Sequence, residues 1–138
     1  MIHSLLLPAL AHMALTLALY AWLTFARARA VKTGQARYSD YQFAGNEPPQ
    51  VARITRNLAN QFELPLFFYV AILALMQLGS AGMMDVILGW LFVAGRVLHT
   101  MVQTRTDNVP LRGQVFMLNS VAVAGLIGHL ALVVLGFI

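Results

Sequence analysis

Four apolar segments occupy most of this chain and decide what kind of structure it can form. They cover about residues 4–26, 57–78, 86–103 and 114–138. Each segment is close to the ~20 residues that an α-helix needs to cross the hydrocarbon core of a bilayer. The chain has 138 residues, of which 59% are hydrophobic and 10% are charged, and its mean hydropathy is +0.72. Soluble domains are only ~45–50% apolar. We therefore predict an all-α integral membrane protein, with one four-helix bundle over residues 1–138.

The connections between these segments differ in charge. Eight of the nine lysine and arginine residues lie in or beside two connections, one at about residues 27–56 and one between the third and fourth segments. The connection GSAGMMD, between the second and third segments, has no basic residue. Lys and Arg concentrate in cytoplasmic loops, so we predict that both chain ends face the non-cytoplasmic side. The net charge of +4 is interpreted first as this orientation signal and second as attraction for an anionic lipid or ligand.

The first segment and the connection after it carry two further expectations. No basic stretch precedes the first segment, so we expect it to remain as a helix and not to be removed as a signal peptide. The connection contains YSDYQFAGNEPPQ, whose prolines and glycine oppose regular helix. We expect it to cap the cytoplasmic end of the bundle, and its basic start could instead extend the first helix.

Several classes of chemistry are disfavoured by the residues present. The chain has no cysteine, which excludes disulfides, thiolate metal sites and a protein thiol nucleophile. Any thiol chemistry must therefore come from a ligand. The four histidines show no metal-ligand spacing, so no metal site is predicted. Nucleic acid is not an expected partner, because the chain has no soluble basic domain.

Polar residues recur at helical spacing in three of the four predicted helices. In the second helix, spacings of three or four place on one face Arg53, Arg56, Asn60, Glu63 and Phe67. In the third helix, the same spacing places on one face Arg96, His99, Thr100 and Gln103. The fourth helix begins with Arg112 and continues that face through Phe116 and Asn119. These groups predict a shared polar region in the cytoplasmic half of the bundle.

Glu63 and Arg96 are expected at about the same depth. Glu63 lies ten residues beyond Arg53, and Arg96 lies nine residues before Arg105. An isolated charge at mid-bilayer costs at least ~2.5–3.5 kcal/mol, so we expect these two to pair. One interpretation is a buried structural lock, and the other is a partly hydrated pocket for an anion, which the surplus of arginines favours. Pro65 predicts a kink just beyond Glu63, which either opens space there or is simply tolerated.

Two sequence blocks resemble a known membrane family. Arg56, Asn60 and Glu63 form R-x-x-x-N-x-x-E, followed by LPLFFY. Further on stand GRVLHTMVQ and PLR, the latter ending in Arg112. These blocks are similar to the helix-2 signature, the R-x-x-H-T stretch and the P-x-R of the MAPEG family, the membrane-associated proteins in eicosanoid and glutathione metabolism. The resemblance covers essentially the whole chain and is strongest to bacterial members.

The resemblance implies a homotrimer of four-helix subunits in a bacterial inner membrane. Glutathione would be held in a polar cavity between neighbouring subunits, open to the cytoplasm. Carried over by position, Arg56, Asn60 and Glu63 would hold the backbone and charged ends of the tripeptide. His99 would line the same pocket, and Arg96 would orient Glu63.

The resemblance also implies a catalytic residue and shows departures from the family pattern. Arg112 matches the arginine thought to stabilise the glutathione thiolate, and a guanidinium near sulfur favours that anion. Gln103 belongs to the predicted glutathione-binding set, but eukaryotic members place a tyrosine there. Gly113 and Phe116 stand where a serine and a tyrosine can occur. These missing hydroxyls remove candidate proton donors to sulfur, which disfavours prostaglandin or leukotriene synthase activity.

Three functional hypotheses follow. The first is a membrane glutathione transferase or peroxidase that acts on hydrophobic electrophiles or lipid hydroperoxides, which enter from the bilayer along the apolar helix faces. The second is a non-catalytic lipid-binding or scaffold protein of the same fold, so enzyme activity stays open at this point. The third is a small transporter subunit with Glu63 as a proton site, against which the lack of internal repeats counts.

Overall fold

The computed structural model describes residues 2–43 and 45–138 of the chain. Its elements are α1 (Ile2–Lys32), the short 3-10 helix η1 (Tyr38–Tyr41), α2 (Pro49–Ala59), α3 (Leu64–Gln77), α4 (Met83–Arg105) and α5 (Val109–Val134). No strand occurs in these residues. Four segments are long and apolar enough to cross a membrane, with α2 and α3 together forming one of them. The predicted all-α membrane bundle of four crossing segments is confirmed.

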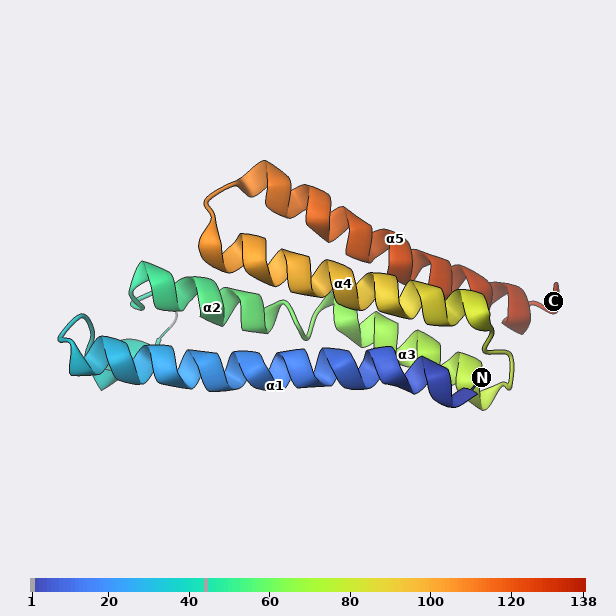
Figure 1. The fold of residues 1–138 in the computed structure, drawn as a ribbon, viewed down its shortest axis with the longest axis horizontal. Coiled ribbons are helices and arrows are strands. Elements are labelled where there is room, and N and C mark those ends of the chain that lie inside the picture. Colours follow the sequence, from blue (N-terminus) through green and yellow to red (C-terminus); the bar gives the residue numbers. More distant parts are fainter. Residues whose placement is uncertain (1, 44) are drawn as a thin grey trace.

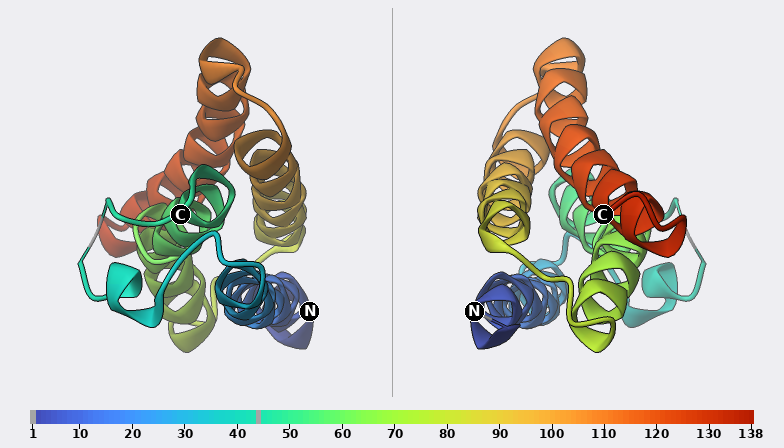
Figure 2. Two further views of the ribbon diagram at one scale, coloured as in Figure 1. Left: turned by 90° about the vertical axis from the view of Figure 1, so that its left-hand side faces the viewer. Right: turned by 90° about the vertical axis from the view of Figure 1, so that its right-hand side faces the viewer.

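The helices run along the long axis of an elongated bundle (Figure 1). Both chain ends lie at one end of the bundle, together with the α3–α4 turn, and we call this the terminal end. The α1–α2 and α4–α5 connections lie at the other end, which we call the basic end. The two end-on views in Figure 2 show α5 crossing the bundle obliquely. It packs against both α4 and α3.

The helices are longer than the apolar segments from which they were predicted. α1 continues past residue 26 to Lys32, and α5 begins at Val109. At the basic end α2 begins at Pro49, inside the segment predicted as a connection over residues 27–56. Hydropathy marks only the part of a helix inside hydrocarbon, whereas arginine and lysine side chains let a helix continue into the interface. The connection that remains, between Lys32 and Pro49, is therefore shorter than the predicted one.

The second predicted helix is interrupted. α2 ends at Ala59 and α3 begins at Leu64, where a kinked but continuous helix was predicted over residues 57–78. Pro65 lies in the first turn of α3. Its ring has no N–H to donate to the carbonyl of Gln61 and clashes with that carbonyl in a continuous helix. The chain instead makes single tight turns, with Gln61 N donating to Leu58 O at 3.0 Å and Phe62 N donating to Ala59 O at 3.0 Å.

Two apolar clusters form the interior, one on each side of this interruption. The cluster toward the terminal end includes residues of all four crossing segments, among them Leu5, Phe68, Phe92 and Leu126. The cluster toward the basic end joins α1 to α2 and includes Leu23 and Ile54. The fully buried side chains of His12 and Arg96 are hydrogen-bonded to residues of the interruption, between the two clusters. The interruption thus coincides with a polar layer across the bundle.

The connection at the basic end is folded onto the helices. Arg27 of α1 forms an ion pair with Glu47, whose side chain is buried, and lies 5.0 Å from the centroid of the Tyr41 ring. Arg53 of α2 forms an ion pair with Asp107 of the α4–α5 connection. These contacts hold the two basic connections against the bundle, so Arg27 and Arg53 have structural roles.

Candidate functional site

The polar layer is built around the side chain of Gln61. Its Oε1 accepts hydrogen bonds from Arg96 Nε at 3.1 Å and from the His12 ring at 3.0 Å. Its Nε2 donates to Asn57 O at 2.9 Å. Asn57 Nδ2 in turn donates to Thr100 Oγ1 at 3.1 Å. The layer therefore joins α1, α2 and α4 at the level where the α2–α3 segment is interrupted.

Arg96 lies fully buried at the centre of this layer. Its Nη2 donates to the backbone oxygen of Asn60 at 2.9 Å. In a continuous helix that carbonyl would be bonded to the N–H of Leu64, so the interruption releases it. Backbone polar groups at membrane depth require an internal partner, and Arg96 supplies one. The guanidinium and the interruption stabilise each other.

The predicted pair between Glu63 and Arg96 is wrong. Among the described residues, no ion pair joins the two side chains, and Glu63 is exposed. The depth matches, but the interrupted helix turns Gln61 toward Arg96, and Glu63 lies at the start of α3. Gln61 and the Asn60 carbonyl occupy the role predicted for the carboxylate. Arg96 therefore does not orient Glu63 within this chain.

The predicted face of the second helix is turned away from the interior. Arg56 and Glu63 are exposed, Asn60 is half-buried, and Phe67 is 56% exposed. Neither Arg56 nor Glu63 has an ion-pair partner in the part of the chain that the structure describes. We call Arg56, Asn60 and Glu63 the outward stripe. Within one chain, these residues do not join the polar face of α4 in a common cavity.

The predicted residues of α4 are buried and incompletely bonded. Arg96 Nη1, His99 Nδ1 and Gln103 Oε1 have no hydrogen-bond partner within residues 2–43 and 45–138. Spacings of three and four place these residues on one face of α4. Asn119 Oδ1 on α5 is also without a partner in this region. A cluster of buried polar atoms without partners is unusual in a folded protein and calls for a bound water, ion or ligand.

Arg112 lies near this face but at its edge. It is half-buried in the first turns of α5, one turn before Phe116. The Phe116 ring lies against the His99 ring, with 6.1 Å between their centroids. Arg112 thus lies one helical turn from a ring that contacts the α4 face, and its side chain is partly exposed.

Several residues of the polar layer were not predicted as site residues. His12, Asn57, Gln61 and Tyr69 are joined in one network, in which the His12 ring also bonds the Tyr69 hydroxyl at 2.7 Å. The sequence holds a signal for one member of this network. Pro65 removes the helical partner of the carbonyl four residues before it, which is that of Gln61.

A second buried polar pair lies near the terminal end. Asp85, fully buried in the first turn of α4, contacts His129 Nδ1 of α5 at 2.7 Å. Asp85 also accepts a hydrogen bond from Gly82 N at 2.8 Å, which caps α4. Sequence reasoning did not pair these residues. Among the described residues, no group of three or more histidine or acidic side chains is suited to hold a metal ion.

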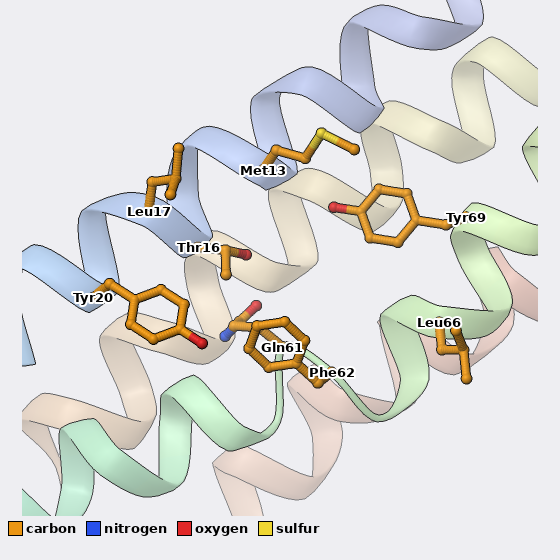
Figure 3. Close-up of a pocket in the computed structure, with 8 residues that line it drawn as sticks. All are labelled: Met13, Thr16, Leu17, Tyr20, Gln61, Phe62, Leu66 and Tyr69. Atoms are coloured by element: carbon orange, nitrogen blue, oxygen red, sulfur yellow. The ribbon is translucent and has the colours of Figure 1, made fainter.

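Two hollows are present on the surface of the bundle. One, of about 560 Å³, lies between α1 and the α2–α3 interruption (Figure 3). The other, of about 1010 Å³, lies between the basic end of α1 and the start of α2. Neither is lined by the seven predicted site residues, which are Arg56, Asn60, Glu63, Arg96, His99, Gln103 and Arg112.

Comparison with known proteins gives one match. The model of the MAPEG family matches residues 5–132, which is nearly the whole chain and includes both sequence blocks described above. No curated protein and no solved structure matches the chain.

Proposed function

The chain belongs to the MAPEG family, and from this premise we propose that it is a membrane-bound glutathione transferase or peroxidase. At the level of the family, it is a membrane protein of eicosanoid and glutathione metabolism. The proposed acceptors are hydrophobic electrophiles or lipid hydroperoxides that reach the protein from the bilayer.

The observation that carries the proposal is the outward stripe. Glu63 is exposed at the middle of the membrane-crossing segment Pro49–Gln77, and Arg56 is exposed two turns before it. A carboxylate in contact with lipid at this depth is costly, so another chain or a ligand must cover it. We propose that a neighbouring subunit of a homotrimer does so, with its basic end in the cytoplasm.

Such an assembly brings together two sets of groups that are separate within one chain. One subunit contributes Arg56, Asn60 and Glu63, and its neighbour contributes the α4–α5 side with Arg112. The buried atoms of Arg96, His99 and Gln103 that lack partners provide donors and an acceptor close to this side. In this arrangement the site lies between subunits and not within one of them.

These groups complement glutathione. The tripeptide has two carboxylates, one ammonium group and two amides. Arginines bind carboxylates through paired, charge-assisted hydrogen bonds, which suits Arg56, while Glu63 suits the ammonium group and Arg112 is assigned to the sulfur. Gln103 Oε1 is a buried acceptor suited to an amide N–H. The residues therefore complement the ligand in the sign of their charges.

The chemistry assigned to these residues is simple. Bound glutathione would supply the thiol nucleophile. The guanidinium of Arg112 stabilises the thiolate over the thiol, while Arg56, Asn60 and Glu63 fix the tripeptide. Phe116 and the apolar helix faces beside it exclude water and accept the hydrophobic partner.

Glutathione binding to the detergent-purified protein tests the proposal. Calorimetry should give saturable binding, and difference absorbance near the thiolate band should report the anion on the same sample. Arg112→Ala should remove the thiolate signal, and Glu63→Gln should weaken binding about tenfold or more, as expected for a lost charge-assisted contact. Arg105→Ala removes another exposed arginine near the basic end and should change neither signal.

The contrary result is equally informative. If wild-type protein does not bind at millimolar glutathione, the proposed activity is wrong. The second candidate, a non-catalytic lipid-binding or scaffold protein of the family, is then favoured. One observation supports it, since Gln103 and Phe116 supply no hydroxyl where relatives have tyrosine.

A further inference from the structure

The hollow at the basic end has a positively charged lining. It has a volume of about 1010 Å³ and lies between the last turns of α1, the connection after them and the start of α2. Arg29 of α1 and Arg53 of α2 line it, and among the described residues no aspartate or glutamate does. Its other polar side chains are neutral, namely those of Thr33, Gln35, Gln50 and Thr104. The charge of the hollow therefore favours an anion.

Both arginines have N–H groups available to a ligand. Arg29 is exposed and has no ion-pair partner in the part of the chain that the structure describes. Within the same residues, Arg53 donates only from Nη2, to Asp107, whose side chain is 87% exposed. A guanidinium has five N–H donors in a planar fork that matches the oxygens of a phosphate group. An anion in the hollow can therefore be bound by α1 and by α2 together.

The start of α2 adds to the positive potential of the two arginines. α2 begins at Pro49, and no side-chain hydrogen bond caps its first turn. The hollow is lined by Pro48, Pro49, Gln50 and Val51, so this uncapped end borders it. The N-terminus of a helix carries about half a positive charge. An anion between the arginines is stabilised by this partial charge as well.

The depth of the hollow indicates that the anion belongs to a lipid. Trp22 and Phe25 lie on its wall and are exposed. Trp22 lies twenty residues along α1, or about 30 Å, which is the thickness of the hydrocarbon core. Tryptophan rings are typical of this level. Arg29 lies two turns farther along α1, at the level of the headgroups. The hollow thus joins an apolar wall at the edge of the hydrocarbon to guanidinium groups above it.

We propose that this hollow binds the phosphate of an anionic phospholipid, such as phosphatidylglycerol. Arg29 and Arg53 bind the phosphate oxygens, and the acyl chains extend along Phe25 and Trp22 into the bilayer. A zwitterionic lipid is bound more weakly, because its ammonium group lies near two guanidinium groups and finds no carboxylate in the described lining. The site is separate from the proposed glutathione site and does not depend on it.

Tryptophan fluorescence of the full-length protein in lipid nanodiscs tests this proposal. The chain has two tryptophans, of which Trp22 lines the hollow and Trp90 on α4 does not. Their exposed fractions are similar, at 42% and 45%. Trp90→Phe therefore reports on the hollow through Trp22, and Trp22→Phe is the matched control that reports through Trp90.

The probes are phosphatidylglycerol and phosphatidylcholine whose acyl chains carry bromine near the headgroup, which quenches nearby tryptophan. Each probe is mixed in rising amounts with unbrominated phosphatidylcholine. Quenching of Trp22 should give an affinity for phosphatidylglycerol about fivefold or more above that for phosphatidylcholine, as one basic residue at an anionic surface provides. Trp90 should show no such preference.

Substitutions made in Trp90→Phe assign the preference to the hollow. Arg29→Gln should reduce it at least twofold, and adding Arg53→Gln should remove it. Because Arg29 has no ion-pair partner among the described residues, its single substitution separates lost binding from lost folding. Arg37→Gln with Arg105→Gln is the matched control, since it removes two exposed arginines outside the lining and should leave the preference intact.

Four results would each overturn the proposal. These are equal affinities of Trp22 for the two probes, the same preference at Trp90, a preference that survives loss of both lining arginines, and its loss in the Arg37 and Arg105 control.

Inorganic phosphate distinguishes a lipid from a free phosphate as the ligand. Added at millimolar concentration and constant ionic strength, it should leave the quenching of Trp22 by phosphatidylglycerol unchanged. Loss of the preference would assign the site to free phosphate and overturn the lipid proposal. Calorimetry with glutathione on the same samples reports separately on the proposed function.

Discussion

Gln61 is the residue on which the polar layer depends. Its Oε1 accepts from Arg96 and from His12, and no other side-chain acceptor serves Arg96 Nε among the described residues. Loss of this oxygen would leave a buried cation and a buried imidazole each short of one partner. Unsatisfied buried groups cost about 1–3 kcal/mol each, and more where the group is charged.

We expect Gln61→Leu to destabilise the protein by about 3 kcal/mol or more. Gln61→Glu should retain more of the stability than Gln61→Leu, because a carboxylate still accepts from Arg96 and His12. It should nevertheless unfold below wild type, because it cannot replace the hydrogen bond that Gln61 Nε2 donates to Asn57 O. Thermal unfolding in one detergent compares the two variants with wild type. Gln77→Leu, at an exposed glutamine of α3, is the matched control and should unfold close to wild type. Equal unfolding temperatures for the two Gln61 variants would contradict this account.

Gln61 also shows which part of the polar layer could be predicted from the sequence. The depth of Arg96 could be predicted by counting residues, and its need for a partner could be predicted from the cost of a charge at mid-bilayer. The choice of Glu63 as that partner assumed one helical phase through residues 53–67. Pro65 interrupts the helix, so residues on the two sides of the interruption no longer share one helical face. Gln61 then points inward, and Glu63, two residues later, points outward. After a helix interruption, the direction in which a side chain points depends on tertiary contacts. These contacts cannot be predicted from the spacing of residues in the sequence.

At the scale of elements, close contact between helices relies on particular glycines. A Cβ on Gly89 of α4 would lie 2.8 Å from Cγ and 3.3 Å from Cβ of Pro8 on α1. The proline ring is rigid and cannot turn aside, so a methyl group there would push the two helices apart. Small residues of this kind permit close helix packing in membranes.

Gly89→Ala should therefore destabilise the bundle by about 1–3 kcal/mol, the usual cost of overpacking. Gly128→Ala is the matched control, because no atom lies within 4 Å of its added Cβ. That change should be neutral or stabilising by up to about 1 kcal/mol, since alanine favours helix over glycine. Thermal unfolding of both variants in the same detergent measures the difference. Similar values for the two would show that the α1–α4 contact is looser than described.

At the scale of the whole molecule, four membrane-crossing segments were predictable because hydropathy and length act on every residue of a segment. The helix ends were less predictable, since charged residues such as Lys32 and Arg53 extend helices beyond the hydrocarbon. At the site, too, a property of a whole helix face was predictable, whereas the direction of single side chains was not. The α4 face was correctly expected to be polar and lies buried, whereas the outward direction of Arg56 and Glu63 emerged only once α2 was packed on α1 by Ile54 and Leu58.

The exposure of the outward stripe leads to a prediction about the assembly, namely that each glutathione site is shared between two subunits. A cyclic trimer has head-to-tail interfaces, so each proposed site takes its stripe from one subunit and its Arg112 from the next. Glu63→Leu trimers should fail to bind glutathione, and Arg112→Ala trimers should give no thiolate signal. Mixed trimers from equal amounts of both variants should recover about a quarter of the wild-type sites, because one ordered neighbour pair in four carries both intact groups.

The recovery distinguishes the proposed assembly from a site within one chain. If Glu63 and Arg112 served the same site inside a subunit, every site in a mixed trimer would still carry one defect, and no thiolate signal would return. The measurement is the thiolate difference absorbance per subunit on co-expressed, differently tagged chains, with native mass spectrometry to count the subunits. The chain lacks cysteine, so no thiol exchange or disulfide can scramble the count. Recovery without a three-chain mass would retain the shared site and reject the trimer.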